Sequence, residues 1–179
     1  MGSPQALSEA DRRIVALWAA DCAERVLPLF VAEAPDDDRP TDAIARARAF
    51  GRGELDAAGQ IRVRFVAGRA AKAVTGQATI AAARSAAQAS GVCHMGAHAL
   101  GAAAYAAKAA GLAAPDAEGA MDAELRWQLD HMSRAVSDAL RRLPLLGADA
   151  AGPLGSGLLA SGVLALAIRT LQAGLSGSA

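Results

Sequence analysis

The sequence is poor in several residue types whose scarcity limits what the protein can be. Its 179 residues include two cysteines, six aromatic residues and two lysines, and asparagine is absent. Cys22 and Cys93 are far apart and have neither a CxxC nor a zinc-finger spacing. No signal peptide precedes them, so we expect free thiols in a reducing cytoplasm.

Excess charge is also missing. The chain has 18 basic and 18 acidic side chains, for a formal net charge of +0. Nothing is left over to neutralise phosphates, and the few aromatic residues could not form a base-stacking platform. We therefore expect no nucleic-acid partner.

Alanine, by contrast, is abundant, with 49 residues or more than a quarter of the chain. It is the best helix former and the smallest side chain with a Cβ, so this composition favours closely packed helices over a β-rich fold. The predicted fold class is all-α, a compact multi-helix bundle of antiparallel helical hairpins.

Start and stop signals divide most of the chain into helices. A capping-box-like start at Ser8 opens the first, which is kinked or ends near Pro28. Residues 34–40, with two prolines and three acids, are predicted to form a loop. Further helices are expected over residues 42–50, 54–74, 77–90, 92–112, 121–131 and 133–143.

The last part of the sequence is nearly uncharged. Residues 150–168 are long enough in principle to cross a membrane, but glycines and a proline leave only about ten to twelve strongly apolar residues. We predict no membrane span. The expected organisation is a disordered N-terminus (1–7), a helical-bundle domain (8–146), and a glycine-rich linker with an apolar helix (147–179) packed on the bundle or on a dimer partner.

Two histidines have a spacing that could suit a metal. His94 and His98 are four residues apart in the helix predicted over 92–112, so they would share one face. A mononuclear site needs at least a third protein ligand, and Cys93 would point about 100° away from His94. We expect no metal and favour histidines that make structural or ligand hydrogen bonds.

The first helix carries two carboxylates, Asp21 and Glu24, beside its apolar stripe. They could be solvated edge residues, could pair with an arginine such as Arg25 or Arg39, or could line a polar pocket. Burial beside His98 would raise a carboxyl pKa and allow acid–base chemistry.

Three of the few large aromatic residues, Trp18, Tyr105 and Trp127, are either core anchors or the walls of a ligand cavity. The sequence contains no Walker motif, no dinucleotide fingerprint and no Ser/His/Asp elbow. We therefore expect no cofactor.

Several blocks, taken in order, resemble the Imm-5-like family of actinobacterial immunity proteins. The blocks are 18–30, 38–44, 49–54 and 94–106, and the resemblance extends over roughly Leu7 to Gln128. It implies an all-α cytoplasmic protein that binds a cognate toxin, and it brings no catalytic set. Positions that match the family pattern are Trp18, Asp21, Cys22, Glu24, Arg39, Pro40, His98, Tyr105 and Trp127.

Two functions remain open at this stage. The first is a binding protein of immunity or self-protection type that sequesters a toxin or a toxic small molecule. The second is a cofactor-free enzyme of a specialised metabolic pathway, such as a cyclase, isomerase or hydrolase. The enzyme hypothesis assigns catalysis to Asp21, Glu24 and His98. Candidate ligand-binding residues are Trp18, Cys22, Arg39, His94, Tyr105 and Trp127.

Overall fold

The computed structural model describes residues 3–57 and 64–177. This part of the chain contains helices and no strand, which confirms the predicted all-α bundle. The elements are α1 (Glu9–Glu33), α2 (Arg39–Gly51), α4 (Arg64–Ala70), α5 (Gln77–Gly91), α6 (His98–Ala113), α7 (Ala117–Asp130), α8 (Arg134–Leu140), the 3-10 helix η1 (Leu158–Ala160) and α9 (Gly162–Gly177).

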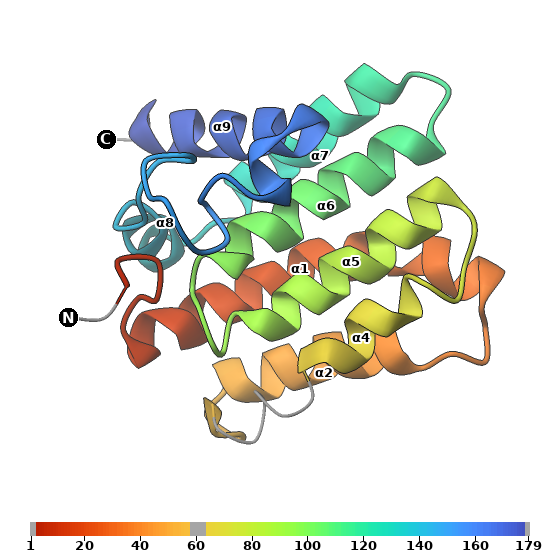
Figure 1. Ribbon diagram of the computed structural model, residues 1–179, viewed down its shortest axis with the longest axis horizontal. Coiled ribbons are helices and arrows are strands. Elements are labelled where there is room, and N and C mark those ends of the chain that lie inside the picture. The colour runs from red at the N-terminus through yellow and green to blue at the C-terminus, as the bar shows by residue number, and fades with distance from the viewer. Residues whose placement is uncertain (1–2, 58–63, 178–179) are drawn as a thin grey trace.

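Helix α6 is the centre of the bundle. It packs against α1, α5, α7 and α9, and Figure 1 shows it between α5 and α7, with α2 and α4 below and α9 above. Its residues are mostly alanine and glycine, so neighbouring helices can approach closely. A Cβ added at Gly101 would lie 3.0 Å from a methyl carbon of Leu159. The small side chains of α6 therefore allow it to be enclosed by its neighbours.

Helix α1 begins as the sequence predicts. The Ser8 side chain accepts a hydrogen bond from the Asp11 backbone N–H at 3.1 Å. The helix does not end at Pro28 but continues to Glu33. Buried Val26 and Phe30 lie on either side of the proline, so packing holds the helix together where one backbone hydrogen bond is lost.

The start of α6 differs from our prediction. The expected helix over 92–112 begins only at His98, and residues 92–97 form a turn. Backbone N–H groups of Gly96 and Ala97 donate to the carbonyls of Ala6 and Gln5, each at 3.0 Å. These bonds occupy donors of the turn and build residues 3–7, which we expected to be disordered, into the fold.

Gln5 also ties the N-terminal segment to the loop before η1. Its side chain is fully buried. The amide oxygen accepts from the Leu154 N–H at 2.8 Å, and the amide nitrogen donates to Asp149 at 3.1 Å and to the Ala151 carbonyl. Gly152 has φ +79°, and a Cβ there would lie 2.6 Å from the Gln5 amide oxygen. One glutamine side chain thus joins the N-terminal segment to residues 149–154.

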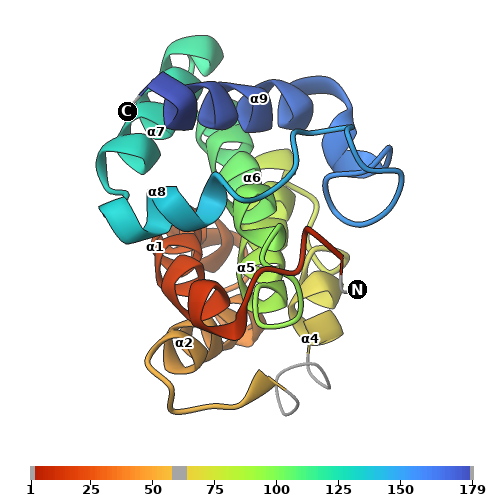
Figure 2. The same cartoon turned by 90° about the vertical axis from the view of Figure 1, so that its left-hand side faces the viewer.

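Helix α9 packs against α6 and α7, and Figure 2 shows it lying across the bundle above α6. Its buried apolar residues are Leu164, Ala165, Ala167, Ile168, Leu171 and Leu175. Among the helices of the described residues, none is long and apolar enough to cross a membrane. Of the helix predicted over 54–74, residues 58–63 lie outside the described residues, and the described part contains α4 followed by a turn.

Candidate functional site

A buried polar cluster joins α1, α6 and α7. The Glu124 side chain is 5% exposed, and one of its carboxylate oxygens lies 2.9 Å from Arg25 Nε. The Gln128 amide nitrogen donates to Glu124 at 3.2 Å and to the Ala103 carbonyl at 3.1 Å. The Trp18 indole N–H donates to the Gln128 carbonyl at 3.0 Å. Three helices are therefore held in one register by polar contacts within the core.

The orientation of the Gln128 amide follows from its two acceptors, because only the NH₂ end can donate to both. Its oxygen is buried and has no hydrogen-bond partner among the described residues. Glu124 and Gln128 were not among the residues predicted from the sequence. They are two polar positions in the buried stripe 121, 124, 125 and 128 of α7, and polar residues at apolar-stripe spacing are the signal that would have found them.

Cys22 lies beside this cluster and is fully buried. Burial raises the pKa of its thiol well above the usual value, and the charges of Glu124 and Asp21 raise it further. The thiol therefore stays protonated at neutral pH. A reactive cysteine has the opposite environment, exposed and electropositive.

The cluster reaches the surface at Trp127. The Arg25 guanidinium lies over the Trp127 ring, 3.9 Å from its centroid. The His131 ring stacks on the same indole, with centroids 3.9 Å apart and planes 21° from parallel. His131 Nδ1 is 2.8 Å from the Trp127 carbonyl, so this nitrogen carries a proton. We call Arg25, Trp127 and His131 the Trp127 patch.

Asp21 and Glu24 lie on the α2 side of α1 and share one arginine, Arg48. Its guanidinium is 2.7 Å from an Asp21 oxygen and 2.6 Å from a Glu24 oxygen. Both carboxylate side chains are more than half exposed. The hydrogen bond from Arg48 lowers the pKa of Glu24 and raises the pKa of Arg48 itself. A carboxyl group that acts as a general acid at neutral pH needs a raised pKa. The lowered pKa of Glu24 therefore argues against that role.

The two histidines lie in different environments. His94 is exposed in the turn before α6, and His98 is the first residue of that helix. The prediction that they share one helical face is therefore wrong, because the turn interrupts the helix between them. His98 Nδ1 is 2.7 Å from the Gln88 side-chain oxygen on α5. Within residues 3–57 and 64–177, no group of three or more His, Cys, Asp or Glu could hold a metal ion.

The remaining predicted residues lie apart from each other. Arg39, the first residue of α2, forms an ion pair with Asp37 in the loop that precedes this helix. Tyr105 is buried in α6, and its hydroxyl is 3.5 Å from an Arg84 guanidinium nitrogen. Trp18, Cys22 and Trp127 thus lie at one polar cluster. Asp21 and Glu24 instead contact Arg48, and His98 contacts Gln88.

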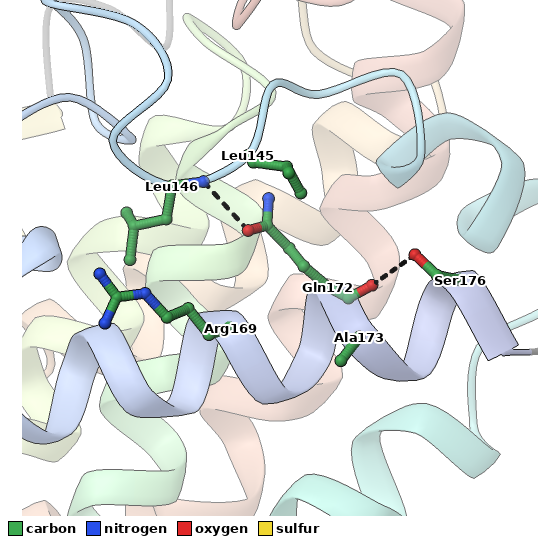
Figure 3. A pocket seen from close by; sticks show the side chains of 6 residues that line it. All are labelled: Leu145, Leu146, Arg169, Gln172, Ala173 and Ser176. Atoms are coloured by element: carbon green, nitrogen blue, oxygen red, sulfur yellow. Dashed lines mark hydrogen bonds between the residues drawn. The ribbon is translucent and has the colours of Figure 1, made fainter.

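A separate groove of about 340 Å³ lies between the segment before η1 and α9 (Figure 3). None of the predicted site residues lines it. Its lining residues are Leu145, Leu146, Arg169, Gln172, Ala173 and Ser176.

One known protein family matches most of the chain. The model of the family described as "Imm-5 like putative immunity protein" matches residues 5–135. The chain belongs to this family. No curated protein and no solved structure matches it. The Imm-5-like match includes Gln5, the Trp127 patch and the Arg48 ion pairs. It ends at the start of α8, so the groove beside α9 lies outside it.

Proposed function

We propose that this Imm-5-like protein neutralises a protein toxin by binding it through the outer surface of α1 and α7 around the Trp127 patch. The observation that carries the proposal is the placement of Arg25. Its guanidinium covers Trp127 and is held by the buried carboxylate of Glu124. Tryptophan and arginine dominate the energetic centres of protein interfaces. Side chains fixed before binding lose less entropy when the complex forms.

The surface next to the patch is charged and ordered. Asp21, Glu24 and Arg25 are three and four residues apart on α1, so they share an outward face. Arg48 fixes both carboxylates from α2. Positioned charges at the rim of an interface select the partner and speed association. This arrangement suits an inhibitor that must recognise one toxin among many proteins.

The contacts support binding better than acid–base catalysis. Arg48 favours the ionised form of Glu24. The groups expected to line a ligand cavity also bond within the protein, since Trp18 donates to Gln128 and Tyr105 lies near Arg84. Both cysteines are buried reduced thiols, which supports action in a reducing compartment that we infer to be the cytoplasm.

The test is co-expression of the full chain with each toxin domain encoded beside its gene. Wild-type protein should rescue growth and bind the toxin in calorimetry. Trp127→Ala should weaken binding by about 30-fold or more, as expected for an interface centre worth about 2 kcal/mol. Arg134→Ala is the matched control, since the Arg134 side chain is 95% exposed on α8. Failure of the wild type to neutralise any such toxin would refute the proposal. Full rescue by Trp127→Ala would show that the Trp127 patch is not the binding surface.

A further inference from the structure

Arg169 is the single charged residue of the sequence from 150 to 179. It lies on the exposed side of α9. Among the residues that the structure describes, it has no ion pair and no hydrogen bond through its side chain. Most other arginines of the described chain hold a carboxylate or a carbonyl, as Arg25, Arg48 and Arg141 do. A carboxylate of a binding partner could therefore pair with this guanidinium without displacing an acidic side chain of the same segment.

Two hydrogen bonds made by the Gln172 side chain fix one wall of the groove beside Arg169. The Gln172 amide oxygen accepts from the Leu146 N–H at 3.1 Å, and the amide nitrogen donates to the Pro144 carbonyl at 3.0 Å. These bonds fix the segment before η1 against α9, as Figure 3 shows for the first of them. The groove is therefore held open by the fold and does not depend on a bound molecule.

Apolar side chains line part of the groove and lie beside it. Leu145, which lines the groove, is 66% exposed, and Leu166, one turn before Arg169 and next to the groove, is 56% exposed. Leu166, Arg169 and Ala173 follow one another at three and four residues, so they form a stripe along α9. Large apolar side chains gathered beside a pocket are typical of an interaction surface. Together the groove presents leucines and one positive charge.

We propose that this groove is a docking site for a segment of a partner protein that places an apolar side chain between Leu145 and Ala173 and a carboxylate on Arg169. The site differs from the Trp127 patch in its chemistry and lies outside the residues that match the family. A helix or strand with leucines and one well-placed Asp or Glu has the required complementarity. The proposal does not depend on the partner being the toxin.

A second copy of this chain fits the groove less well. We expected that the C-terminal helix could mediate a dimer, but α9 and the residues after it contain no acidic side chain. A symmetric pairing of two α9 faces would bring together two guanidinium groups and no acidic side chain from either helix. Covering an unpaired charge costs free energy, so the charge pattern favours a different, acidic partner.

The experiment titrates the full-length, ¹⁵N-labelled protein with an acetylated, amidated helical peptide of about 14 residues, with leucines at i, i+3, i+4 and i+7 and glutamates beside them. Saturable amide shifts should appear at Leu145, Leu146 and Ala173. Replacing the glutamates by glutamines, or making Arg169→Gln, should weaken binding about tenfold, because the bound peptide covers the ion pair. Arg126→Gln is the control, since Arg126 is an exposed arginine on α7.

Three outcomes would overturn the proposal: no saturable shifts at the groove, equal affinity for the glutamate and glutamine peptides, or sedimentation that shows self-association through α9 abolished by Arg169→Glu. Arg169 is exposed, so its variants should keep the wild-type melting temperature. Arg169→Glu should also transfer the preference to a lysine version of the peptide. That reversal is an effect that unfolding cannot produce.

Discussion

Arg25 and Glu124 form an ion pair with one buried and one exposed partner. The carboxylate is 5% exposed, the arginine side chain is 38% exposed, and the closest N···O distance is 2.9 Å. Water can hydrate the arginine if its partner is lost. It cannot easily hydrate the carboxylate. The two ends of this pair should therefore tolerate substitution very differently.

We predict that Arg25→Met destabilises the protein more than Glu124→Gln. The first change leaves a buried carboxylate without its counter-charge and should cost about 2–3 kcal/mol. The second keeps the shape and an acceptor and should cost about 1 kcal/mol. Urea unfolding of both variants at neutral pH measures the difference. Equal losses, or the reverse order, would show that Glu124 is not held by Arg25.

We predict that Arg48 stabilises the protein near neutral pH and not in acid. The hydrogen bond from Arg48 lowers the pKa of Glu24 in the folded protein below its usual value of 4.5. Its contribution is therefore present above that value and is lost as the pH falls through the lower, folded pKa. Wild type should lose more stability than Arg48→Gln when unfolding is compared at about pH 7 and about pH 3. The difference at pH 7 should stay below about 1 kcal/mol, because both carboxylates are exposed. A pH-independent difference would contradict this explanation.

We predict that Gly152→Ala releases the N-terminal segment. Gly152 and Gly147 both have positive φ, but only at Gly152 would a Cβ collide with the Gln5 amide. Gly147→Ala should therefore lose only about 1 kcal/mol from backbone strain. Gly152→Ala should lose more and should speed hydrogen exchange of residues 3–8. Similar exchange in both variants would mean that Gln5 does not anchor the segment.

We predict that Cys22 resists thiol reagents in the folded protein. It is fully buried, and burial raises the pKa of its thiol, so little thiolate forms near neutral pH. In a Cys93→Ala background, labelling by a disulfide reagent should proceed at the rate of unfolding and should accelerate in urea. Rapid labelling of the native protein would show that the α1–α7 interface opens locally.

Sequence reasoning identified the helices where local signals were strong. Ser8 caps α1 as predicted, and the helix predicted from residue 42 begins three residues earlier, at Arg39, so that Pro40 belongs to α2 and not to the predicted loop. It failed where long-range contacts decide the structure. Between Val92 and Ala97 the only local signal against a helix is the single glycine Gly96, and the turn there has backbone hydrogen bonds to Gln5 and Ala6. These hydrogen bonds join residues about 90 positions apart in the chain, and the hydrophobic periodicity of the sequence does not report such contacts.

The candidate site was also only partly predictable. The scarcity of aromatic residues drew attention to Trp18 and Trp127, and both contact the cluster around Glu124. The pairing of Asp21 and Glu24 with Arg48 depends on how α1 and α2 pack, so the arginine could not be chosen from sixteen candidates. Helix spacing gives the face of a side chain, and it does not give the neighbour across the interface.

The enclosure of α6 has a consequence for how the chain is made. Synthesis proceeds from the N-terminus, so α6 leaves the ribosome before α7 and well before α9, which covers one of its sides. Until residues 162–177 have been translated, the small apolar side chains of α6 that face α9 stay exposed to water. During that interval the nascent chain has an open, alanine-lined seam that chaperones or neighbouring chains can contact. The last helix in chain order closes it.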